Sequence, residues 1–92
     1  MTTLYVGIRR EATLRLLVAQ RRAGSIWYEL CWEGKAENVE EQAFAMIAQH
    51  LDDGDCAQSM SANFARLISA RLNADFWTLR PSEIDEAIAS QR

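Results

Sequence analysis

The sequence predicts a single α+β domain in which a three-stranded antiparallel β-meander is followed by three α-helices, in a two-layer packing. Apolar residues alternate with period two through the first third of the chain, and they recur at helical spacing through the rest. The gaps between the alternating segments are short enough for hairpin loops. Because the 92 residues contain no repeat and no long linker, we expect residues 1–92 to form one domain.

The three predicted strands are recognised by their alternating apolar residues, and their separators are residues 9–12 and 21–25. A three-residue loop at 22–24 pairs even positions of the second strand with even positions of the third. It also gives Gly24 the left-handed conformation that such loops favour. In this register the apolar residues share one face, which a one-residue slip would lose. The predicted core face consists of Leu4, Val6, Ile8, Leu14, Leu16, Val18, Ile26, Tyr28, Leu30 and Trp32.

Trp27 lies on the opposite face of the predicted sheet, where apolar, aromatic and arginine side chains are mixed. Trp, Tyr and Arg are enriched at the centres of protein interfaces. We therefore interpret this face as a partner-binding surface, and the alternative is that the third helix covers it. The candidate partner-binding residues are Tyr5, Arg15, Leu17, Arg21, Arg22 and Trp27.

The first predicted helix follows the third strand directly. Asn38 is a suitable N-cap, and apolar residues recur at helical spacing from Val39 to Leu51. Gly54 is expected to end this helix, in the role that a C-terminal glycine usually has.

Two further helices are predicted in the C-terminal half of the chain. Asp55 is expected to cap the second, whose apolar positions run from Met60 to Leu72. A break at 73–75 and an apolar anchor at 76–79 then precede a third helix that begins at Pro81. Its apolar positions are Ile84, Ala87 and Ile88.

The sequence carries no signature of catalysis, so we predict that the protein is not an enzyme and uses no cofactor and no metal. His50 is the single histidine and fits a helix C-terminus, where a partly positive imidazole is favourable. The acidic segment 52–55 fails the EF-hand pattern, because the twelfth position from Asp53 is Phe64 and not a glutamate. No glycine-rich phosphate loop and no nucleophile elbow occurs.

The charge of the chain is divided unevenly. Residues 1–35 hold six basic and three acidic groups (+3), whereas residues 36–92 hold four basic and ten acidic groups (−6). An isoelectric point near 5.0 is not typical of a general nucleic-acid binder, although a few arginines could reach RNA already held in a protein complex. The candidate phosphate contacts are Arg9, Arg10, Arg21 and Arg22, in two loops at opposite ends of the meander.

No apolar run is long enough to span a membrane, and the N-terminus lacks the features of a secretory signal. We therefore expect a cytoplasmic protein that does not associate with a membrane. Cys31 and Cys56 fit no metal or redox spacing and are expected to be reduced thiols.

In size and composition the chain resembles phage-encoded anti-CRISPR proteins, which are small, acidic, compact and free of motifs; the resemblance extends to no particular residues. It implies a non-catalytic, stoichiometric inhibitor that docks on a larger host protein or ribonucleoprotein complex, such as a CRISPR surveillance complex, in the host cytoplasm. Two alternatives stay open. One is a small nucleic-acid-binding or transcriptional accessory protein, and the other is a homodimeric structural protein that buries the Trp27 face against itself.

Overall fold

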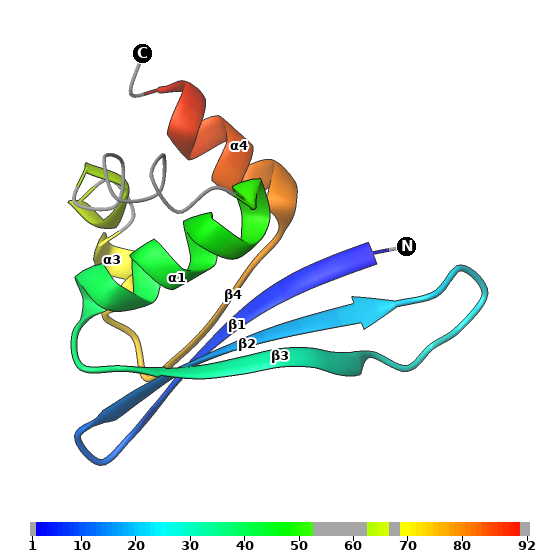
Figure 1. Cartoon of the computed structure of the whole chain (residues 1–92), viewed down its shortest axis with the longest axis horizontal. Coiled ribbons are helices and arrows are strands. Elements are labelled where there is room, and N and C mark those ends of the chain that lie inside the picture. The colour runs from blue at the N-terminus through cyan, green and yellow to red at the C-terminus, as the bar shows by residue number, and fades with distance from the viewer. Residues whose placement is uncertain (1, 53–62, 67–68, 91–92) are drawn as a thin grey trace.

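The computed structural model describes residues 2–52, 63–66 and 69–90. In these residues an antiparallel four-stranded sheet carries helices on one face, which gives an α+β fold of two layers (Figure 1). The strands, in the spatial order β3-β2-β1-β4, are β1 (Thr2–Arg10), β2 (Thr13–Arg21), β3 (Glu29–Ala36) and β4 (Phe76–Leu79). The described helices are α1 (Val39–Leu51), α3 (Ser69–Leu72) and α4 (Pro81–Ala89), and residues 63–66 are also helical.

The fourth strand corrects the predicted three-stranded meander. Residues 76–79, which the sequence predicted only as an apolar anchor, pair antiparallel with β1, with Tyr5 opposite Leu79 and Ile8 opposite Phe76. The sequence Phe-Trp-Thr-Leu does not alternate between apolar and polar residues, so the sequence pattern could not identify this strand. β4 forms one edge of the sheet and β3 forms the other.

The turn between β1 and β2 decides which side chains of β1 face the helices. Arg10 pairs with Thr13, so the turn consists of residues 11–12, and Glu11 adopts a left-handed φ of 55°. A two-residue turn pairs odd positions of one strand with even positions of the other. Because the even positions of β2 face the core, the odd positions of β1 face it as well.

This pairing reverses the predicted orientation of β1. Tyr5 and Gly7 are buried, and they pair with Val18 and Leu16 of β2. The predicted core placement is confirmed for Leu14, Leu16 and Val18, which are all buried. It is wrong for three residues of β1, because they alternate with the buried positions and therefore point away from the helices. These residues are Leu4, Val6 and Ile8.

A β-bulge in β3 separates two registers. Val18 pairs with Trp32, which keeps the predicted pairing of even with even positions, although the predicted loop at 22–24 would have placed Tyr28 opposite Val18. Ala19 pairs with Leu30, and Cys31 falls between the two pairs. The extra residue turns Leu30 to the face opposite Trp32. Trp32 packs against the core as predicted. The predicted core placement is wrong for three residues at or beyond the bulge, which are exposed: Ile26, Tyr28 and Leu30.

The β2–β3 connection is longer than predicted, because the pairing stops at Gln20 and Glu29. Gly24 has the predicted left-handed conformation, with a φ of 83°. The pair of hairpin strands runs out beyond the helical layer and ends in this connection (Figure 1). The result is a projecting arm that consists of residues 22–28 and the adjoining strand ends.

The core lies between the sheet and the helices. The Trp77 indole packs across Gly7, at a place where the Cβ atom of any other residue would overlap the ring. Gln42 is buried in α1, and its Nε2 donates a hydrogen bond of 3.0 Å to the Arg15 carbonyl, which ties the helix to β2. The other main core side chains are Leu16, Ala43, Met46, Ile47, Phe64, Leu72, Leu79, Ile84 and Ile88.

The predicted start of the first helix is confirmed. The Asn38 side chain accepts a hydrogen bond of 2.8 Å from the Glu41 amide, as an N-cap does. α1 ends at Leu51, where Asp52 adopts a left-handed conformation. The predicted end at Gly54, the cap at Asp55 and the first part of the second predicted helix lie outside the described residues.

The predicted start of the last helix is confirmed, and the structure shows on which face of the sheet this helix packs. α4 begins at Pro81, and Ile84 and Ile88 are buried. α4 lies on the same side of the sheet as α1, so it does not cover the face that the sequence left in doubt (Figure 1). Among the described residues, no helix is both long and apolar enough to cross a membrane.

Candidate docking surface

The face of the sheet turned away from the helices, which we call the open face, carries a continuous set of apolar side chains. This face exists because the two-residue turn pairs the even positions of β1 with the odd positions of β2, and the side chains of both sets point away from the helices. In the described part of the chain, no helix lies over this face (Figure 1). Its apolar members, from all four strands, are Leu4, Val6, Ile8, Leu17, Ala19, Leu30 and Phe76.

Apolar area on this scale is unusual for a sheet face that only meets water, since antiparallel sheets alternate apolar residues inside with polar residues outside. Leu30 and Phe76 are 58% and 64% exposed, and the apolar side chains of β1 and β2 on this face are half-buried by their neighbours. A contiguous exposed apolar patch with charged residues at its rim is typical of a protein interaction site.

The charged residues of the open face are mostly basic. β1, β2 and β3 contribute four basic side chains (Arg10, Arg15, Arg21, Lys35) and one acidic side chain (Glu33), a net charge of +3. The whole chain has a net charge of −3. The net charge of the open face is therefore opposite in sign to the net charge of the whole chain, and a face with a positive net charge attracts acidic groups.

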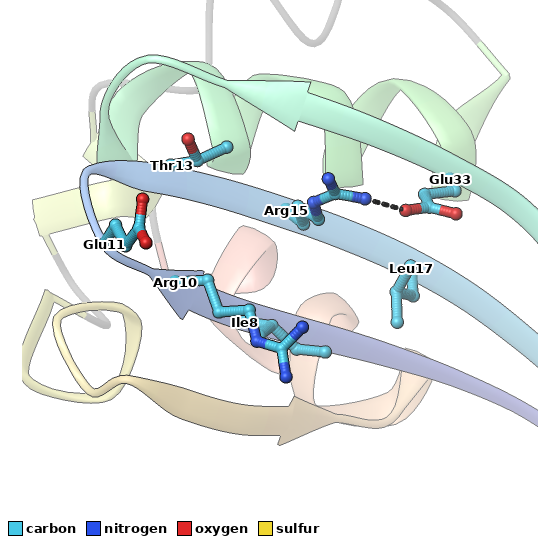
Figure 2. Close-up of a pocket in the computed structure, with 7 residues that line it drawn as sticks. All are labelled: Ile8, Arg10, Glu11, Thr13, Arg15, Leu17 and Glu33. Atoms are coloured by element: carbon cyan, nitrogen blue, oxygen red, sulfur yellow. Dashed lines mark hydrogen bonds and ion pairs between the residues drawn. The ribbon is translucent and has the colours of Figure 1, made fainter.

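A hollow with a volume of about 890 Å³ lies on the open face near the β1–β2 turn. Figure 2 shows Ile8 and Leu17 inside it, with the Arg10 and Arg15 side chains beside them. Arg15 Nη1 forms an ion pair with Glu33 Oε1 at 2.7 Å, which fixes the guanidinium over β2 and leaves Arg10 free of any described carboxylate. Glu11 and Glu33 also line the hollow, so two arginines and two glutamates surround its apolar residues and its own charge is balanced.

The projecting arm adds aromatic residues beside the open face. Trp27 is 75% exposed, and its amide donates a hydrogen bond of 3.1 Å to Ser25 Oγ. The Arg21 guanidinium lies over the Tyr28 ring, with its carbon 5.4 Å from the ring centroid. Exposed aromatic and arginine side chains at a tip are well suited to contact a partner.

The structure keeps five of the six predicted partner-binding residues accessible and removes one. Tyr5 is only 4% exposed and faces the helices, because the two-residue turn reverses β1. Arg15 and Leu17 lie on the open face, whereas Trp27 and Arg22 belong to the arm and Arg21 joins the two. The sequence missed the apolar residues of β1 and β4 on this face, and the length of the first turn was the signal that could have found those of β1.

The four candidate phosphate contacts occupy the two ends of β2, as predicted, but three of them belong to strands. Arg9 and Arg10 end β1, and Arg21 ends β2, so only Arg22 lies in a loop. The antiparallel register puts the first pair near the β1–β2 turn and the second at the arm. They form no single basic cluster.

His50 has a more specific environment than a solvated helix end. Its Nε2 lies 2.6 Å from Asp85 Oδ1, and its Nδ1 lies 3.4 Å from the Tyr5 hydroxyl. A neutral imidazole that donates from Nε2 leaves Nδ1 to accept from the phenol. Burial raises the pKa of Tyr5, and the Asp85 charge adds to this. Because the phenol ends inside the core, we interpret the chain of contacts as a link between α1, α4 and β1.

Within the described ranges, no three histidine, cysteine or acidic side chains converge as metal ligands. Comparison of the chain with models of protein families, with curated proteins and with solved structures finds no significant match. The candidate site therefore depends on its geometry and chemistry alone.

Proposed function

We propose that the protein is a non-catalytic binding protein that docks through its open face on an acidic surface of a larger protein. The observation that carries this proposal is the apolar face of the sheet, with a net charge of +3 contributed by β1–β3. An apolar centre supplies affinity by the area it removes from water, and the surrounding arginines select carboxylates. The arm, with Trp27 at its tip, extends this surface.

Charge supports a different protein over a second copy of the chain as the partner. Two open faces brought together would oppose like charges, which costs binding energy. Charge also disfavours naked nucleic acid, because the apolar centre of the face offers little for a phosphate backbone, and the rest of the molecule is acidic. A protein or ribonucleoprotein complex of the CRISPR surveillance type, in the host cytoplasm, is one partner of the class we propose.

The test compares partner capture by the wild-type chain with capture by two variants that add the same negative charge. Leu17→Glu places a carboxylate in the centre of the open face, and Gln49→Glu places one on the exposed side of α1. Each tagged protein is incubated with host lysate, with and without nuclease, and the captured proteins are quantified by mass spectrometry. Circular dichroism spectra verify that both variants are folded.

We expect the wild-type chain to capture one partner in stoichiometric amount, and nuclease should not abolish this capture. The Gln49→Glu variant should capture the same amount of this partner as wild type, and the Leu17→Glu variant should capture at least fivefold less. Equal capture by both variants would contradict docking through the open face. A partner that disappears with nuclease would favour the nucleic-acid accessory alternative. Capture of nothing but the chain itself, together with a dimer in sedimentation that Leu17→Glu dissociates, would favour the homodimeric alternative.

A further inference from the structure

A second hollow lies at the other end of the sheet from the β1–β2 turn, where the start of β1, the end of β2 and the junction of β4 with α4 meet. Its volume is about 360 Å³. Three arginines line it, and they come from three separate parts of the chain: Arg21 from β2, Arg71 from α3 and Arg80 from the β4–α4 junction.

The single carboxylate of this hollow is fully used by its neighbours. Glu83 Oε1 pairs with Arg71 Nη1 at 3.0 Å, and Glu83 Oε2 accepts a hydrogen bond of 2.8 Å from the Arg80 amide. Arg71 Nη2 donates to the Thr78 carbonyl at 2.8 Å, so this guanidinium is anchored. Glu83 therefore balances one of the three positive charges, and the hollow keeps a net charge of +2.

The other two guanidiniums form no described ion pair, although the Arg80 charge lies near enough to Glu83 to help lower the pKa of that carboxyl. Arg21 is oriented by the Tyr28 ring beneath it, and a cation–π contact leaves its N–H donors available in the plane of the group. Arg80 precedes the first turn of α4, where the helix N-terminus adds positive potential of the same sign. Thr2 and Thr78 also line the hollow, and their hydroxyls are further hydrogen-bond donors.

We propose that this hollow binds a phosphate monoester or inorganic phosphate, held by the Arg21 and Arg80 guanidiniums. The net charge of +2 matches a phosphate that carries −1.5 to −2 at neutral pH, as phosphate monoesters do. Planar guanidinium groups bind phosphate through paired hydrogen bonds, in which two N–H groups donate to two phosphate oxygens. The volume accepts a phosphate and a small attached group. This inference does not depend on docking through the open face.

The test is a titration of the isotopically labelled full chain with inorganic phosphate, followed by amide chemical shifts at constant ionic strength. We expect saturable shifts around Thr2, Tyr28 and Arg80. Arg21→Ala and Arg80→Ala should each weaken binding roughly tenfold or more, since each removes hydrogen bonds to a charged group. Arg22→Ala is the matched control, because Arg22 is exposed beside Arg21 and does not line the hollow, and it should bind as wild type does.

Glu83→Gln should change the affinity for phosphate in the opposite direction. It removes the negative charge beside the ligand and releases Arg71, so we expect phosphate to bind more tightly. Shifts that sodium chloride reproduces at equal ionic strength, or affinities that Arg21→Ala and Arg80→Ala leave unchanged, would overturn the proposal.

Two further ligands distinguish the source of the phosphate. Adenosine monophosphate that binds more tightly than inorganic phosphate indicates a phosphorylated small molecule, and equal affinities indicate that the phosphate group alone is recognised. A single-stranded oligonucleotide without a terminal phosphate that binds while inorganic phosphate does not would overturn the proposal in favour of a nucleic-acid backbone.

Discussion

At the scale of single residues, two glycines accommodate tryptophan rings on the helix side of the sheet. The Trp77 indole crosses Gly7, and the Trp32 ring lies against Gly34. Both glycines sit in strands, where glycine otherwise weakens the pairing because it has no side chain to pack. The close approach of the rings explains why glycine is present at both positions.

The two contacts differ in how far the ring can move, and this predicts unequal costs of substitution. Trp77 is buried at 4% exposure, so Gly7→Ala should lower the free energy of unfolding by about 2 kcal/mol, as overpacking of a tight core does. Trp32 is only partly buried, and its ring can shift, so Gly34→Ala should cost less. Urea unfolding of both variants measures the difference, and a larger loss in Gly34→Ala would contradict this account of the core.

Glu83 makes part of the stability dependent on pH. The backbone hydrogen bond from Arg80 is the main cause that holds the pKa of this carboxyl below its usual value. Burial acts in the opposite direction, and the hydrogen bond and charge of Arg71, with the charge of Arg80, lower the pKa further. A lowered folded-state pKa gives stability that is present above the unfolded-state pKa and is lost as the pH falls through the folded-state pKa. The window therefore lies below about pH 4.3, the ordinary glutamate value.

We expect Glu83→Gln to be less stable than wild type at pH 6, and the difference should shrink as the pH falls to 3, because protonation removes the carboxylate charge that the amide lacks. Urea midpoints at the two pH values measure it. A difference that stays constant between pH 6 and pH 3 would show that the carboxylate charge is not what stabilises the start of α4.

At the scale of elements, the sequence pattern predicted what depends on local periodicity. The alternation in β2, the cap at Asn38 and the proline that begins α4 all act within a few residues, and the structure confirms them. The predicted orientation of β1 is wrong because it depends on whether the first turn has two residues. Arg9 and Arg10, predicted as loop residues, belong to β1 and pair with Leu14 and Thr13 of β2.

The bulge at Cys31 and the convergence of the arginines were out of reach for a different reason. A bulge is one extra residue in one strand, and an uninterrupted alternation through Trp32 gives no sign of it. Arg21, Arg71 and Arg80 meet only because β4 pairs with β1 and because Arg71 is anchored on β4. Such contacts depend on tertiary structure, which periodicity does not encode.

The projecting arm predicts a separation between stability and binding. Trp27 is 75% exposed and contributes little to the core, so Trp27→Ala should change the free energy of unfolding by less than about 0.5 kcal/mol. If the arm contacts the partner, the same variant should weaken capture at least fivefold. Urea unfolding and quantitative capture measure the two effects. A larger loss of stability would contradict the claim that Trp27 contributes little to the core, and capture equal to wild type would exclude the arm from the interface.

At the scale of the whole molecule, the fold divides the chain into two unlike surfaces. The sequence of residues 36–92, with ten acidic and four basic groups, supplies the described helices, and these lie on one side of the sheet (Figure 1). The strands of the first third carry five of the ten basic groups and leave their apolar open face uncovered by any described helix. The proposed docking on an acidic partner uses this division of charge.

The measurement that most directly tests docking through the open face is side-chain labelling with a photoreactive carbene, applied to the free protein and to its complex with the captured partner. We predict that Ile8, Leu17 and Phe76 are labelled in the free protein and protected in the complex. Phe44, which is exposed on α1, should be labelled equally in both. Protection of Phe44, with Leu17 and Phe76 still labelled, would contradict the account, because the partner would then sit on the helices.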